Sequence, residues 1–176
     1  MKKILAFSGS PSSNSINHKL VEAAVALLDG VDATVIRLSD FELPFYSADI
    51  EEDGYPTGVE KLKELFLSHD GFLISSPEYN GMMPAMLKNV IDWVSRVQKP
   101  IFNDKPIMLM SASPGERGGM TNHDNMKSLM NWWGGKVEGS YMLGKFHEHF
   151  DADAVTLTEQ ESSKLKAELE KFKASL

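Results

Sequence analysis

The stretch that decides the fold is residues 76–93, SPEYNGMMPAMLKNVIDW. It follows a short apolar run, Gly71–Ser75, which predicts a buried strand. It then turns through a proline and a glycine and enters a helix whose first turn contains Pro84. Open α/β sheets bind their ligands just beyond the carboxyl ends of their strands. The stretch therefore predicts a ligand-binding loop between a strand and a helix.

The same alternation of strand and helix runs along the rest of the chain. Apolar runs predict strands at residues 4–7, 33–38, 71–75, 106–111 and, more briefly, 136–138. Apolar residues at helical spacing predict helices near residues 16–28, 59–67, 83–94, 126–133 and 165–172. Thr158 and Glu161 have the spacing of a capping box that opens the last helix. Ser39–Thr57 has no clear period and predicts a long surface loop.

Five strand–helix units imply one parallel sheet with helices on both of its faces. Five strands favour the flavodoxin-like order 2-1-3-4-5 over the six-stranded dinucleotide fold, so we expect one α/β three-layer domain over residues 1–176. In that order the switch point lies between strands 1 and 3. The loops after those two strands should therefore meet at the ligand.

Composition limits the partners of such a domain. The chain has 176 residues, is 42% hydrophobic and carries a formal charge of −7, which argues against contact with nucleic acid or anionic membranes. It has no cysteine, which excludes disulfides, zinc–thiolate sites and cysteine catalysis and fits a cytoplasmic protein. The apolar run after Lys3 is too short for a signal peptide, and no run reaches the about 18 residues of a membrane span.

The loop after the first strand, residues 8–17, reads SGSPSSNSIN and is rich in hydroxyl and amide groups. Such clusters often form turns and helix N-caps. Their place after strand 1 favours a phosphate site, because free N–H groups at a helix start bind phosphate. The candidate ligands are Ser10, Ser12, Ser15, Ile16 and Asn17. The loop lacks the Gly-Lys-Ser/Thr ending of a Walker A motif and is not Gly-x-Gly-x-x-Gly.

Two further loops should reach the same end of the sheet. In Pro77–Gly81, the candidates Pro77, Glu78, Tyr79, Asn80 and Gly81 would border a flat heterocycle. The alternative interpretation is a tight turn with Tyr79 packed on the fold. The loop after strand 4, residues 111–119, reads SASPGERGG, and its glycines permit close backbone approach. A planar ligand with a phosphate tail indicates flavin mononucleotide (FMN).

These motifs together resemble the NADPH-dependent FMN reductase family, which includes chromate and quinone reductases and related azoreductases. The resemblance covers about residues 4–140. It rests on Gly9-Ser10 with Ser15-x-Asn17, SPEYNG at 76–81, LKN-x-IDW at 87–93, and Ser113-Pro114-Gly115-x-x-Gly118-Gly119. The Pro-Glu-Tyr-Asn-Gly element is the distinctive one.

The resemblance implies a flavodoxin-like fold with FMN at the interface of a homodimer, often within a homotetramer. It implies that NADPH or NADH reduces FMN, which then reduces a small-molecule acceptor: a quinone, an azo compound, free flavin or a metal oxyanion. By the same matching, Ser10, Ser15 and Asn17 hold the phosphate, Pro77–Gly81 borders the ring, and Ser113, Gly115 and Gly118 lie on a third flavin-side loop. The flavin carries the chemistry, so no side chain is expected to be catalytic. Many relatives carry Arg where this chain has Ser12, which removes a cation from the phosphate loop.

Other features have less weight. Glu78 is either a functional carboxylate at the site or a residue with a solvent-facing or helix-start role. Arg117 is either an exposed loop residue or a contact for the nicotinamide nucleotide. His147 and His149 do not have an established metal spacing, so no metal is expected. In Trp132-Trp133 we expect one core ring and one ring at the surface or a subunit contact.

Two other functional classes stay open. A flavodoxin-like electron carrier would bind FMN without oxidising NAD(P)H, and a structural relative would have lost FMN altogether. The long loop 39–57, with Phe45 and Tyr46, is expected to wall the site from a neighbouring subunit.

Overall fold

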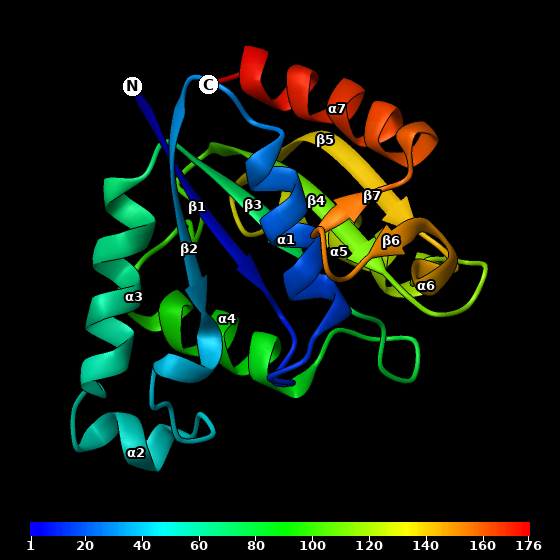
Figure 1. The fold of residues 1–176 in the computed structure, drawn as a ribbon. Helices are drawn as coiled ribbons and strands as arrows, with labels where there is room; N and C mark the ends of the chain where they lie inside the picture. Colours follow the sequence, from blue (N-terminus) through cyan, green and yellow to red (C-terminus); the bar gives the residue numbers. More distant parts are fainter.

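The computed structural model describes all residues from Met1 to Leu176. Its centre is a five-stranded parallel sheet in the order β2-β1-β3-β4-β5 (Figure 1), which confirms the predicted topology. The strands are β1 (Lys2–Ser8), β2 (Val31–Arg37), β3 (Gly71–Ser75), β4 (Lys105–Ala112) and β5 (Gly135–Leu143).

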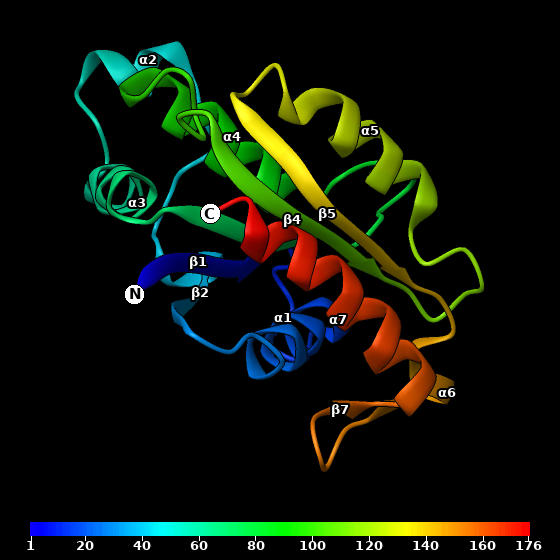
Figure 2. The ribbon, with the colours of Figure 1, turned by 90° about the horizontal axis from the view of Figure 1, so that it is seen from above.

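Helices cover both faces of this sheet (Figure 2). On one face lie α1 (Ile16–Ala26) and α7 (Glu159–Ala174), and on the other lie α3 (Thr57–Ser68), α4 (Ala85–Val97) and α5 (Met120–Met130). None of the helices combines the length and the apolar character that crossing a membrane requires.

The two faces of β1 show why the strands read as continuous apolar runs. Ile4 and Ala6 pack toward α1 and α7, whereas Leu5 and Phe7 pack toward α3 and α4. Successive side chains of a strand point to opposite faces, and each face of this sheet is covered. Both sets of side chains are therefore buried, as expected for a parallel sheet.

Two predicted boundaries at the end of the sheet were wrong. Strand β5 has nine residues instead of the three predicted, and its pairing with β4 shifts after Val137, so that Gly139 stands opposite Met108. Glycine lowers the strand signal, which explains the short prediction. Helix α5 begins at Met120, six residues before the predicted start, because Gly118 and Gly119 turn the chain directly into it.

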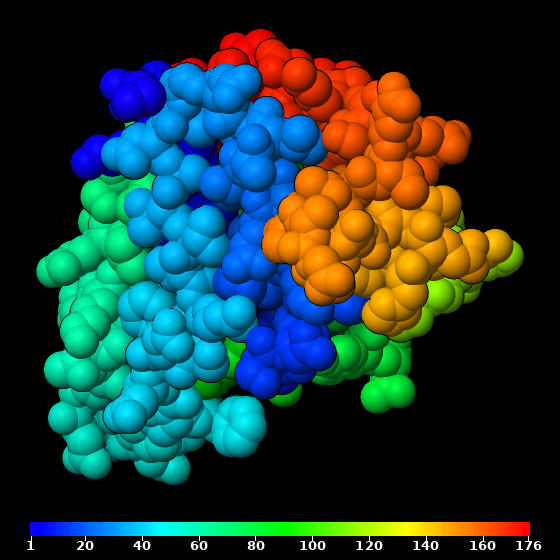
Figure 3. All heavy atoms as spheres, viewed as in Figure 1, coloured from blue at the N-terminus to red at the C-terminus, as the bar shows by residue number.

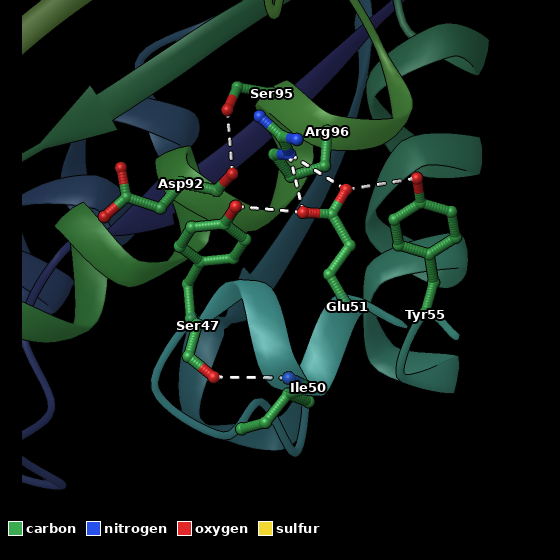
Figure 4. Close-up of polar contacts among 8 residues, drawn as sticks. Ser47, Ile50, Glu51, Tyr55, Asp92, Ser95 and Arg96 are labelled. Carbon is green, nitrogen blue, oxygen red and sulfur yellow. Dashed lines mark hydrogen bonds and ion pairs between the residues drawn. The ribbon is translucent and has the colours of Figure 1, made fainter. Parts of the chain in front are cut away.

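The long loop after β2 is more ordered than its sequence suggested. It contains a 3-10 turn, Leu38–Asp40, and a short helix, α2 (Ala48–Glu52). The Asn89 side chain on α4 accepts from the Tyr46 N–H at 2.9 Å and donates to the Pro44 carbonyl at 3.0 Å. The carboxylate of Glu51 accepts from Arg96 and from the hydroxyl of Tyr55 (Figure 4). These bonds hold the segment against α4.

The chain between β5 and α7 forms elements that the sequence did not predict. A helical turn, α6 (Phe146–His149), precedes a small hairpin of β6 (Phe150–Asp151) and β7 (Thr156–Leu157). The hairpin lies against α1, where its orange atoms touch the blue ones in Figure 3.

The predicted capping box at the start of α7 was wrong. Thr158 occupies the N-cap position but its side chain makes no capping hydrogen bond. Glu161 instead turns inward, where it accepts from the buried Tyr141 hydroxyl at 2.8 Å and from Lys164 at 2.7 Å. The spacing matched the motif, but a buried tyrosine hydroxyl competed for the carboxylate.

Candidate functional site

The loops after β1, β3 and β4 meet at the carboxyl edge of the sheet, as the topology predicted. They enclose a cavity of about 220 Å³. Nine of the predicted residues line it: Ser10, Ser12, Ser15, Ile16, Asn17, Pro77, Glu78, Tyr79 and Ser113. The remaining lining residues are Asn14, Ala112 and Pro114.

The loop after β1 carries unused backbone donors. The side chain of Ser15 accepts from the His18 N–H at 3.2 Å and so caps α1. None of the backbone N–H groups from Ser13 to Asn17 donates a hydrogen bond within the chain. These groups stand at the positive end of the α1 dipole, and the residues from Asn14 to Asn17 line one wall of the cavity. Their arrangement fits an anion such as a phosphate.

The side chain of Asn17 has a different role from the one predicted. Its Nδ2 donates to the Ala112 carbonyl at 2.9 Å, and its Oδ1 accepts from the Ala112 N–H at 2.9 Å and from the Ser75 hydroxyl at 2.8 Å. The residue is 1% exposed. The side chain therefore joins α1 to the ends of β3 and β4, and the backbone N–H of Asn17 makes no hydrogen bond within the chain.

The loop after β3 ends in a tight turn. Tyr79 and Met82 exchange two backbone hydrogen bonds of 2.8 and 3.1 Å around Asn80 and Gly81. Asn80 and Gly81 both have positive φ, 53° and 79°, which is the signature of a type I′ turn and explains the Asn-Gly pair. The turn leaves the Tyr79 side chain 45% exposed. The predicted alternative was therefore correct about the tight turn but wrong about Tyr79, which lines the cavity and is not packed on the fold.

Four predicted residues do not line the cavity: Asn80, Gly81, Gly115 and Gly118. The Gly81 carbonyl accepts from the Asn125 side chain at 3.3 Å. The Gly115 carbonyl accepts from the Ser113 hydroxyl and from the Lys145 N–H. Gly118 packs tightly against the backbone at Gly144. Their glycine and turn patterns shape the loops around the cavity. The sequence alone does not distinguish this role from direct contact with a ligand.

Glu78 has the helix-start role, one of the alternatives to a functional carboxylate. Its Oε2 accepts from the Asn122 N–H at 3.1 Å, in the first turn of α5. The helix dipole stabilises a carboxylate at this position. Asn122 is fully buried and donates to the Ser76 hydroxyl and the Pro77 carbonyl. The ring-side loop is thus fastened to α5 from behind.

Sequence reasoning missed the buried polar residues behind the site. His123 is 2% exposed, and its Nε2 lies 2.9 Å from the Ser140 hydroxyl. Burial lowers the pKa of His123 to about 4. Asn122 and His123 stand side by side in a segment with weak apolar periodicity, so no pattern in the sequence marks them as interior.

The other candidates lie outside the cavity. Arg117 is exposed, with Nη2 3.4 Å from the Thr121 hydroxyl. Trp132 is 87% exposed and Trp133 is half-buried, close to the predicted division. His147 is exposed and His149 half-buried, and no three His, Cys, Asp or Glu side chains group in a way that fits a metal ion.

The fold and the position of the cavity define a flavodoxin-like α/β protein with a candidate anion site at the switch point of its sheet. The chain belongs to the NADPH-dependent FMN reductase family, whose pattern matches residues 2–148. This confirms the resemblance that its loop motifs indicated.

The names of individual similar proteins are consistent with this family. The chain is 37% identical to an NAD(P)H-dependent FMN reductase of Pseudomonas aeruginosa over 66% of its own length and 62% of that protein's, so the match spans less than two thirds of this relative. It is 33% identical to an NAD(P)H:quinone oxidoreductase of Solanum tuberosum over 95% of this chain and 89% of that one. Among solved structures, the flavoenzyme NAD(P)H:(acceptor) oxidoreductase FerB of Paracoccus denitrificans superposes with a TM-score of 0.82 at 27% identity, covering 99% and 97% of the two chains.

Proposed function

We propose that this protein is an NAD(P)H-dependent FMN oxidoreductase that passes electrons to a small-molecule acceptor. The observation that carries the proposal is the meeting of two features in one cavity, the unpaired N–H groups of Asn14–Asn17 and the exposed ring of Tyr79. The first suits a phosphate and the second a flat ring. Membership of the FMN reductase family supports the same ligand.

The residues present fit FMN in a definite orientation. The helix start of α1 would hold its phosphate, and Pro77–Tyr79 with Ser113 would border its ring end. When bound, FMN supplies the two-electron chemistry between a nicotinamide and an acceptor. The chain's part is to bind and orient the flavin, because Glu78, the one carboxylate that lines the cavity, is already bonded to the start of α5.

The acceptor that we favour is a quinone, since relatives along most of this chain carry quinone oxidoreductase names. Azo compounds, free flavin and metal oxyanions are the further acceptors of the proposal. Either NADPH or NADH serves as the donor. Because both nucleotides are metabolites of the cytoplasm, we place the working enzyme there.

A second copy of the chain completes the site in this proposal. A cavity of about 220 Å³ is below the about 300–1,000 Å³ of typical cofactor pockets. Beside it, an apolar groove of about 1050 Å³ lies between α4 and α5. Met82, from the Tyr79–Met82 turn, lines this groove together with the exposed Trp132. We propose that the groove is the homodimer interface and that two dimers can join as a tetramer.

Light scattering on a sizing column tests the assembly. Trp132→Arg should convert the dimer to a monomer, because it places a charge in an apolar contact. Leu67→Arg on α3, an exposed apolar residue that does not line the groove, should leave the dimer intact. A wild-type monomer, or an unchanged dimer in Trp132→Arg, would refute this interface.

The function is tested by soaking the protein with FMN, removing free flavin, and following NADPH and NADH oxidation with a benzoquinone acceptor. Bound flavin with acceptor-dependent oxidation supports the enzyme. Bound flavin without oxidation of either nucleotide would favour the electron carrier, and the absence of binding would favour the structural relative.

A further inference from the structure

The anion site at the start of α1 contains no cation of its own. Residues 8–17 include no Lys or Arg, so its donors are the backbone N–H groups of Ser13–Asn17 and nearby hydroxyls. A helix start supplies about half a positive charge, whereas a phosphate monoester at neutral pH carries nearly two negative charges. The donors of this loop alone therefore leave most of the charge of the phosphate uncompensated.

Arg37 brings a cation to this loop from the neighbouring strand. It is the last residue of β2, which pairs with β1 so that Arg37 stands beside Ser8, where the loop begins. Its Nη1 lies 3.5 Å from the Ser13 carbonyl oxygen, at the outer limit of a hydrogen bond. The guanidinium is therefore in contact with the residue that precedes the free N–H groups of Asn14–Asn17.

No carboxylate forms an ion pair with this guanidinium. Arg37 lines a surface hollow together with His18, Glu22 and Asp40, outside the cavity formed by the three loops. It forms no ion pair there, and Glu22 is 3.6 Å from His18 instead. Asp40 also lines that hollow and forms no ion pair with the guanidinium. Burial, followed by the positive charge of Arg37, lowers the pKa of His18, while Glu22 and Asp40 act in the opposite direction. The field of Arg37 thus reaches the first turn of α1.

We propose that Arg37 is the counter-cation of the FMN phosphate in this protein, supplied from β2 to a loop that has none. The guanidinium has four N–H donors besides its contact with Ser13 and a planar shape that matches phosphate oxygens. A half-exposed side chain at the rim of the loop can turn toward a phosphate without a change in the backbone. This inference rests on the proposed binding of FMN.

Binding of FMN and riboflavin to apoprotein, measured by quenching of flavin fluorescence, tests the role of Arg37. Riboflavin has the same ring and chain but no phosphate. In Arg37→Gln the affinity for FMN should fall about tenfold, the size expected for a partly exposed charged hydrogen bond, and the affinity for riboflavin should not change. Arg37→Lys keeps the charge and should retain most of the FMN affinity.

Lys61→Gln is the matched control, because Lys61 is an exposed lysine of α3 without an ion pair and its loss changes the net charge equally. It should bind FMN as the wild type does. The fall in FMN affinity with added salt should also be shallower in Arg37→Gln than in the wild type.

Equal FMN affinity in Arg37→Gln and wild type would overturn the inference and leave the proposed function standing. So would a parallel loss of riboflavin affinity, or a loss in Arg37→Lys as large as in Arg37→Gln, since each indicates a structural effect. If the wild type binds riboflavin as well as FMN, or binds neither, the phosphate site itself is refuted.

Discussion

The side-chain amide of Asn17 pairs with the backbone of Ala112 as a neighbouring strand would, with one bond of 2.9 Å in each direction. Asn17 stands in the first turn of α1 and Ala112 at the end of β4. The hydroxyl of Ser75, at the end of β3, adds a third bond to the same amide. One side chain therefore holds together the three loops that form the candidate flavin cavity.

Loss of this amide should destabilise the fold. In Asn17→Ala, the buried N–H and carbonyl of Ala112 lose their partner, so we expect a loss of about 2 kcal/mol or more in the free energy of unfolding, measured by urea denaturation. Asn14→Ala removes an exposed asparagine of the same cavity that makes no hydrogen bond and should change stability by less than about 0.5 kcal/mol. Equal stabilities of the two variants would show that the Asn17 bonds contribute nothing net.

Replacement of Gly119 should separate backbone strain from steric overlap. Gly119 has φ 79°, and an added Cβ would overlap the buried hydroxyl of Ser111. Gly30 has φ 76° with open space around it. We expect Gly30→Ala to cost about 1 kcal/mol and Gly119→Ala about 3 kcal/mol, by thermal or urea unfolding. The same cost at both positions would mean that the Ser111 contact relaxes freely.

The buried imidazole of His123 predicts a loss of stability in mild acid. Its pKa is lowered from 6.5 to about 4 by burial, so between these values the unfolded chain binds a proton that the folded chain does not. Stability should therefore fall as the pH drops from 6.5 to about 4, by about 3 kcal/mol from this group, and should not fall further from this cause below pH 4.

Urea denaturation across this pH range measures the effect. His123→Gln should flatten the dependence, because glutamine does not titrate, whereas His147→Gln, at an exposed position, should leave it as in the wild type. An unchanged slope in His123→Gln would assign the acid sensitivity to other groups.

The segment after β2 that contains Phe45 is expected to influence the kinetics of the reaction with the acceptor. Phe45 is 77% exposed and is followed by Tyr46, whose N–H bonds to Asn89 and whose hydroxyl donates to Glu51 at 2.9 Å. An exposed ring on a segment fastened to α4 suits contact with a neighbouring subunit's site. Phe45→Ala should alter the KM for a quinone without loss of stability. Unchanged acceptor kinetics and unchanged assembly would remove this role.

The sequence predicted the sheet order and the meeting of three loops because buried parallel strands and turn residues leave strong local signals. The Asn80-Gly81 pair and the serine-rich loop are examples, since each has a backbone requirement that few residues meet. The same signals predicted Asn80, Gly81, Gly115 and Gly118 at the ligand, and these residues do not line the cavity formed by the single chain.

The remaining features depend on contacts between segments far apart in the chain. Nothing local distinguishes the Asn17 amide, buried against Ala112, from one that faces a phosphate. Nor does the Thr158-x-x-Glu161 spacing reveal that Tyr141 takes the carboxylate. The contact of Arg37 with Ser13 joins residues 24 positions apart, and only the pairing of β1 with β2 brings them together.

The most direct test of the proposed function follows the absorption of bound flavin. Apoprotein is loaded with FMN, freed of excess flavin and mixed anaerobically with NADPH or NADH, after which a quinone is added. We predict one FMN for each chain, bleaching of its visible band by at least one nucleotide, and recovery of the band with the quinone. Protein that retains no FMN, or a bound flavin that neither nucleotide bleaches, would contradict the assignment as an FMN-dependent oxidoreductase.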